Sequence, residues 1–210
     1  MTISRHNDTM TVPSGIITCL PDADLDDVAS VVEVLIQEHL NTFAVPLGRL
    51  GELRSIFGAR ANFGVWGIDG INALTQSIEA DAQFILTDGA DEDMAATARG
   101  HSATWFASAL TPLEVRAVLE LGATGALLWP AEIVGHSMAK HLARLGLTPR
   151  VIPMGGVGAF AAGEWLVHGS PAACVDETLL GDSLGGGDLG MLRDRCESFR
   201  KAALRGVREG

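Results

Sequence analysis

The residues best suited to chemistry are polar side chains that come directly after apolar segments of strand length: Asp69, Asp88, Glu132, His136, Asp176 and Glu177. Glu132 and His136 are four residues apart in a segment whose apolar residues recur at helical spacing, so we expect them to share one helix face. A carboxylate and an imidazole at this spacing could act as an acid–base pair, or could bind a divalent metal together with Asp176. Structural roles compete with both, because a glutamate at a helix N-terminus also stabilises the helix dipole.

Asp69 and Asp88 differ from the other four in their neighbours. Each precedes a glycine, and an aspartate before a glycine is typical of a tight turn. We therefore interpret both as turn residues first and as site residues second.

Eight short apolar segments must position these residues. The predicted strands lie at residues 15–20, 42–47, 61–66, 82–87, 103–108, within 122–132, at 150–154 and at 172–175. Helical spacing, capping residues and prolines predict helices between the strands and after the last one, including 24–39, 71–79, 132–145 and 188–205. Strands separated by helices pair in parallel, because each crossover is a helix.

Repeated strand–helix units define the expected fold class. Eight units in one domain predict an α/β protein with a single (β/α)8 TIM barrel over residues 15–210, after an N-terminal lead-in at residues 1–14. An open doubly wound sheet is the alternative. In a barrel the active site lies on the loops after the carboxyl ends of the strands, and all six polar residues fall there.

Composition excludes several classes of protein. The 210-residue chain carries a formal net charge of −11 and has no basic cluster, so we expect neither nucleic acid nor a membrane as a partner. No apolar stretch approaches the ~20 residues of a membrane span, and residues 1–12 lack the apolar core of a signal peptide, which predicts a cytoplasmic protein. Cys19 and Cys174 lie in apolar runs and are predicted to be buried, inert thiols.

Three motifs give the chain a family resemblance. They are Asp81-Ala82-Gln83-Phe84 in strand four, Trp129-Pro130-Ala131-Glu132 after strand six, and Pro153-Met154-Gly155-Gly156-Val157 after strand seven. With their spacing, which fits from the first strand to the last, the chain resembles the 2-keto-3-deoxy-6-phosphogluconate and 4-hydroxy-2-oxoglutarate aldolases. The resemblance implies a lyase built on a (β/α)8 barrel and assembled as a homotrimer.

The resemblance also locates a missing nucleophile. Members of this family form a Schiff base with a 2-oxo acid through a strand-six lysine, two residues before the aromatic residue that precedes Pro-Ala-Glu. That position is Leu127 here, and the only lysines of the chain, Lys140 and Lys201, fall inside predicted helices. Covalent catalysis by lysine is therefore not expected, and the chain is a divergent member by this comparison.

Other positions that the family uses differ as well. Its general-base glutamate falls at Ala44, and its substrate-binding arginine falls at Gly48, with Arg49 one place later. Its threonines on strands three and seven fall at Gly67 and Met154. By this comparison, the chain lacks the residues that the family uses for acid–base catalysis and for binding the substrate. Arg49 remains a candidate for the substrate contact.

The phosphate site of the family is also replaced. A Gly-Gly-Ser after strand eight would offer N–H groups to a phosphate, but the chain has Asp176-Glu177-Thr178 there. The expected substrate-binding residues are Ala44, Arg49, Trp66, Leu127, Trp129, Met154, Gly155 and Gly156. This largely apolar set suits a ligand with hydrophobic surface, or it simply packs the barrel core.

Three functional hypotheses follow. The first is a lyase-like enzyme that acts on a non-phosphorylated, partly apolar carbonyl compound by acid–base chemistry, as a lyase, isomerase or cyclase, with no cofactor and with Glu132, His136, Asp176 and Glu177 as catalytic residues. The second is a catalytically inactive barrel that binds a ligand or a protein. The third is a metal-dependent carbon–carbon lyase, in which Glu132, His136 and Asp176 hold a divalent ion.

Overall fold

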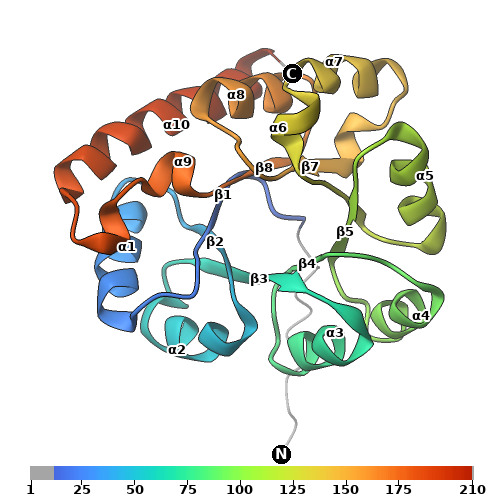
Figure 1. Ribbon diagram of the computed structural model, residues 1–210, viewed down its shortest axis with the longest axis horizontal. Helices are drawn as coiled ribbons and strands as arrows, with labels where there is room; N and C mark the ends of the chain where they lie inside the picture. The colour runs from blue at the N-terminus through green and yellow to red at the C-terminus, as the bar shows by residue number, and fades with distance from the viewer. Residues whose placement is uncertain (1–11, 210) are drawn as a thin grey trace, which may run out of the picture.

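A computed structural model describes residues 12–209 of the chain, with side-chain surroundings up to residue 205. The predicted lead-in at residues 1–14 thus lies mostly outside the described residues. Parallel strands form one eight-stranded sheet that curls into a barrel (Figure 1). They are β1 (Gly15–Cys19), β2 (Thr42–Val45), β3 (Asn62–Ile68), β4 (Ile85–Thr87), β5 (Trp105–Ala109), β6 (Gly125–Leu128), β7 (Val151–Pro153) and β8 (Ala172–Val175).

Helices follow the strands and surround them (Figure 1). They are α1 (Leu25–Gln37), α2 (Leu47–Phe57), α3 (Gly70–Glu79), α4 (Glu92–Gly100), α5 (Pro112–Leu121), α6 (Ala131–Val134), α7 (Ser137–Arg144), α8 (Ala159–Val167), α9 (Glu177–Leu180) and α10 (Leu189–Glu209), with short 3-10 turns η1 (Thr148–Arg150) and η2 (Ser183–Gly185). This arrangement confirms the predicted (β/α)8 barrel. Between residues 12 and 209, no helix is both long and apolar enough to cross a membrane.

Helix α5 shows how local sequence sets an element boundary. Thr111 and Glu114 form a capping box, in which each side chain accepts a hydrogen bond from the other residue's backbone N–H. Pro112 occupies the first turn, where its missing N–H costs nothing. Gly122 ends the helix in the left-handed region, at φ 100°.

The core has two layers because strand side chains alternate in direction. Side chains that point outward pack against the helices and form the larger layer. Side chains that point inward form a second cluster on the barrel axis: Ile17, Cys19, Ala44, Phe84, Leu86, Phe106, Leu127, Ile152, Met154, Ala172 and Cys174, with Trp66 packed against it. The interior of the barrel is therefore a packed apolar core.

The barrel has a seam between β7 and β8. The hydrogen-bonded order runs β7-β6-β5-β4-β3-β2-β1-β8, so β7 and β8 are the two edges of the sheet. Past the ends of these strands, the Thr178 hydroxyl donates to the carbonyl oxygen of Val157 at 2.8 Å. This side-chain bond connects the two edges where ladder pairing does not.

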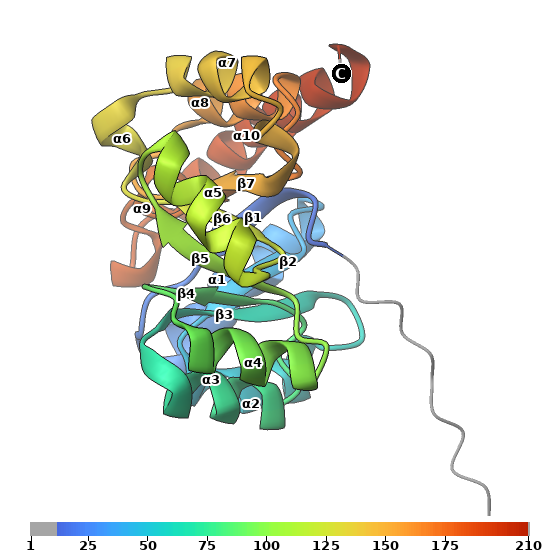
Figure 2. The same ribbon diagram turned by 90° about the vertical axis from the view of Figure 1, so that its right-hand side faces the viewer.

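One predicted helix is wrong. We expected residues 132–145 to form a single helix, but α6 ends at Val134 and α7 begins at Ser137. Gly135 adopts φ 69°, a left-handed backbone conformation that interrupts the helical hydrogen-bond pattern. Figure 2 shows α6 set apart from α7 at the edge of the molecule. The short helix α9 was not predicted from the sequence.

We expect Gly64→Ala to destabilise the barrel. An added Cβ at Gly64 would overlap the ring of Phe84 inside the barrel, so the free energy of unfolding should fall by about 1–3 kcal/mol. Urea denaturation measures this difference. Gly51→Ala is the matched control, because Gly51 lies in α2 with open space around it and should gain up to about 1 kcal/mol. A Gly64→Ala variant as stable as the parent would contradict the packed interior.

Candidate functional site

The carboxyl end of the barrel carries the predicted site residues, and its floor is apolar. Ala44, Leu127 and Met154 are 0%, 3% and 8% exposed and belong to the inner cluster. These three predicted binding residues therefore pack the barrel interior. Trp129 is different, since it lies beyond β6 and is 51% exposed.

Trp66 covers part of this floor. Its indole N–H donates to the carbonyl oxygen of Leu20 at 2.9 Å, so the side chain extends from β3 across β2 to the end of β1. Ala44, on the intervening strand β2, leaves room for it. The half-buried indole packs on the inner cluster, and the space above β1–β3 is occupied by the protein itself.

The turn after β6 is fastened to the end of β7. The backbone N–H of Ala131 donates to Met154 O at 2.8 Å, and that of Glu132 donates to Gly155 O at 3.2 Å. The exposed Glu132 side chain lies against Gly156, where an added Cβ would overlap its carboxylate. Gly156 has φ 66°, so a glycine suits this position both in conformation and in space.

Glu132 and His136 do not share a helix face, contrary to prediction. Glu132 belongs to α6, whereas His136 is the N-cap residue of α7, and Gly135 separates the two helices. The His136 ring instead meets the ring of Phe160, edge to face, with centroids 5.1 Å apart. Because the helix is interrupted between them, a spacing of four residues does not bring these two side chains to one helix face.

The pair Asp176 and Glu177 begins α9. Asp176 is the N-cap residue, and its carboxylate accepts a hydrogen bond from the Thr178 backbone N–H at 3.4 Å. The neighbouring Glu177 is exposed. Asp176 thus uses an N–H group that a bound anion would otherwise need.

Arg49 has partners of its own, since it forms ion pairs with Asp22 at 2.9 Å and Glu52 at 3.1 Å. Asp69 and Asp88 follow the neighbouring strands β3 and β4. Burial, and then the charge of Asp69, raise the pKa of Asp88 above its ordinary value.

No three histidine, cysteine, aspartate or glutamate side chains come together at metal-binding distances within the described part of the chain. Glu132, His136 and Asp176 therefore do not form a metal-ligand group in this conformation.

The thiols are buried, as predicted. Cys19 and Cys174 are 3% and 0% exposed and lie on the neighbouring strands β1 and β8. A hydrogen bond with Cys174, followed by burial, raises the pKa of Cys19 well above its ordinary value. Cys19 therefore stays protonated, and a protonated thiol is a poor nucleophile.

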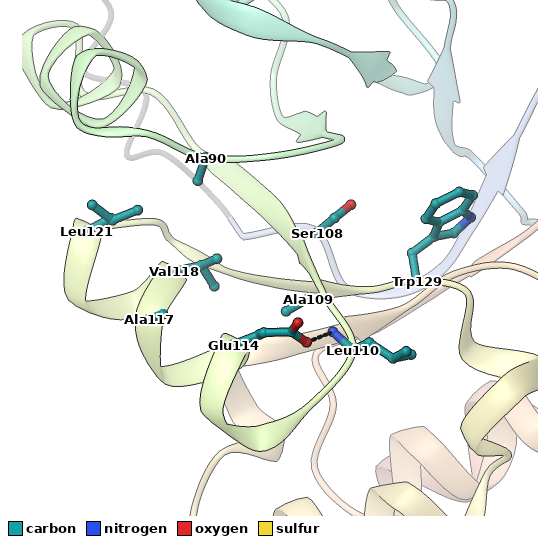
Figure 3. Close-up of a pocket in the computed structure, with 9 residues that line it drawn as sticks. All are labelled: Ala90, Ser108, Ala109, Leu110, Glu114, Ala117, Val118, Leu121 and Trp129. Atoms are coloured by element: carbon teal, nitrogen blue, oxygen red, sulfur yellow. Dashed lines mark hydrogen bonds between the residues drawn. The ribbon is translucent and has the colours of Figure 1, made fainter.

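A hollow that the sequence analysis missed opens beside Trp129. Its volume is about 360 Å³, and it extends from the ends of β5 and β6 along α5 (Figure 3). Ser108, Leu110 and Glu114 contribute to it together with Trp129. The sequence signal at this place was Thr111-Pro112, which predicts the start of a helix and not a pocket.

Comparison with known proteins gives consistent results. A family model described as KDPG and KHG aldolase matches residues 11–191. A 2-dehydro-3-deoxy-phosphogluconate aldolase of Treponema pallidum is 28% identical over 115 residues, which are 54% of this chain and 55% of the relative. That match spans only about half the length of the relative.

Solved structures share the fold at low identity. The native KDPGal structure has a TM-score of 0.79 at 19% identity, with 94% of this chain and 98% of that one covered. A KDPG aldolase from Legionella pneumophila, with pyruvate captured as a covalent carbinolamine intermediate, has a TM-score of 0.75 at 16% identity, with 89% and 94% covered.

Proposed function

Because the chain belongs to the KDPG and KHG aldolase family of lyases, we propose that it keeps the barrel of that family but binds a non-phosphorylated, partly apolar small molecule without forming a Schiff base. The main support is Leu127. Its side chain lies in the inner cluster, and the family resemblance implies that it stands where the family has its lysine. A carbinolamine requires a nucleophilic amine. Lys140 on α7 and Lys201 on α10 are exposed on the outer helices.

Charge supports a ligand without phosphate. The loop after β8 carries the carboxylates of Asp176 and Glu177, and Asp176 already accepts the N–H of Thr178. A phosphate there would meet two negative charges and would have to compete for that N–H. The formal net charge of −11 also disfavours binding of an anion such as phosphate.

The exposed indole supports a ligand with apolar surface. Trp66 and the inner cluster fill the barrel axis, whereas Trp129 is 51% exposed beside the hollow. A ligand would therefore bind at the rim, against Trp129. Binding in this form needs neither a metal nor an organic cofactor.

Acid–base catalysis is a second candidate, and the placement of Glu132 favours it. The carboxylate is exposed and faces the bare backbone of Gly156, so a carbonyl compound at the rim could give up a proton to it. The proposal assigns this role to Glu132 without His136, which lies across the helix break.

Self-association completes the proposal. Ile133 and Phe160 are 69% and 62% exposed on α6 and α8, and large exposed apolar side chains mark interaction surfaces. A homotrimer, as the family resemblance implies, would bury them.

The proposed location of the protein is the cytoplasm.

Incubation with pyruvate followed by borohydride should leave the intact mass of the protein unchanged, because both lysines of the chain lie on outer helices and not in the barrel interior. The Legionella pneumophila aldolase, which holds pyruvate covalently, is the positive control. A reduced adduct on Lys140 or Lys201 would refute the central proposal.

For the second candidate, the protein should speed deuterium exchange at C3 of the uncharged ketone 4-methyl-2-pentanone in D2O, and Glu132→Gln should lower this rate by about 100-fold. Proton NMR follows the exchange. Glu120→Gln, an exposed change on α5, is the matched control. Equal rates in the parent and Glu132→Gln would remove acid–base catalysis by Glu132.

Light scattering after size exclusion should give three times the 22.0 kDa chain mass. The double change Ile133→Asp and Phe160→Asp should produce monomers, since each copy would place charges in the apolar contact. Met191→Asp alters an equally exposed side chain on α10 and should leave the trimer intact. A monomeric parent protein would rule out the trimer.

A further inference from the structure

The hollow beside Trp129 has a chemistry of its own (Figure 3). We propose that it binds an organic cation, namely a primary amine that carries an aryl or alkyl body. This inference rests on the proposed ligand-binding function and names the ligand class. It follows from the walls of the hollow, from its hydrogen-bonding groups and from the charges around it.

The walls suit an apolar body. Ala117, Val118 and Leu121 line the hollow along α5, and Ala90 faces them from the segment after β4 (Figure 3). Small side chains at Ala90 and Ala117 leave the space open. Trp129 lies at the barrel side of the hollow and is 51% exposed, so it offers an aromatic surface to a ligand.

The Glu114 side chain gives the hollow an acceptor. Glu114 Oε2 accepts from Leu110 N at 2.9 Å, from Thr111 N at 2.8 Å and from the Thr111 hydroxyl at 3.0 Å. All three bonds end on Oε2, and the other oxygen lies on the side of Ala109 (Figure 3). A ligand that bonds here must therefore be a donor.

Charge selects a cationic donor. Hydrogen bonds from the backbone N–H groups of Leu110 and Thr111 lower the pKa of Glu114 below its ordinary value, so its carboxylate stays ionised at neutral pH. These donors also offset part of the negative charge of Glu114. Two further features attract an ammonium group to the hollow. Asp91, Glu92 and Asp93 directly follow Ala90 and are exposed, and the face of an indole attracts an ammonium group.

Matched probes test the charge. In titrations followed by 1H–15N NMR, 2-phenylethylamine should shift the amide signals of Leu110 and Glu114 and the indole signal of Trp129. The uncharged isostere 2-phenylethanol should bind about tenfold more weakly or worse, and phenylacetate should not bind in the hollow. Equal affinities for the amine and the alcohol would overturn the inference while leaving the proposed binding function in place.

Matched variants test the position. Glu114→Gln should weaken amine binding about tenfold yet keep the capping box, which accepts glutamine. Ala117→Leu should fill the hollow and abolish binding. Their controls are Glu120→Gln on α5 and Ala96→Leu on α4, both exposed and outside the hollow, and both should bind like the parent.

Two further outcomes are decisive. Unchanged amine binding in Glu114→Gln and Ala117→Leu would place the ligand elsewhere and overturn the inference. Failure of all three probes to bind the parent protein would overturn it too. In that case the borohydride experiment with pyruvate still judges the proposed loss of Schiff-base chemistry, because it does not depend on the hollow.

Discussion

Close packing inside the barrel is the constraint on which the rest of the structure depends. Two strand glycines lie beside aromatic rings of neighbouring segments. A Cβ at Gly64 would overlap the ring of Phe84, just before β4, and a Cβ at Gly125 would lie 2.7 Å from the ring of Phe106 on β5. In each pair, the glycine leaves the space that the large aromatic ring fills. This fit fixes the register of adjacent strands. The described side chains of this interior form an apolar cluster, which agrees with the proposed binding of a ligand at the rim.

Much of the fold could be predicted from local sequence, because each strand is a short apolar run with a turn or cap after it. The break at Gly135 could not, since apolar spacing on both sides of a glycine also suits one continuous helix. The bond from Trp66 to Leu20 was equally hidden. It depends on the small Ala44 of the strand between them, and a single sequence does not show which strands are neighbours in space.

The candidate site was predicted in part. Short sequence motifs predicted Trp129 and Glu132 after the end of β6, where the structure has them. The family resemblance implies that Leu127 stands where the family has its lysine. Ser108 and Glu114 were missed, because Glu114 reads as a capping residue and Ser108 as part of a strand. Only the packed structure brings these two residues to one hollow with Trp129. Residues with a sufficient local role can thus have a second role that local patterns do not reveal.

The pairing of β1 with β8 has a consequence for how the chain reaches this structure. Ile17 pairs with Cys174, so the first strand obtains its second neighbour from near the other end of the sequence. During synthesis, β1 can pair with β2 early, but its other edge stays open until most of the chain has left the ribosome. Contacts between such distant segments slow folding, and open strand edges promote aggregation. Delay or loss of β8 would therefore leave the open edge of β1 without its neighbour.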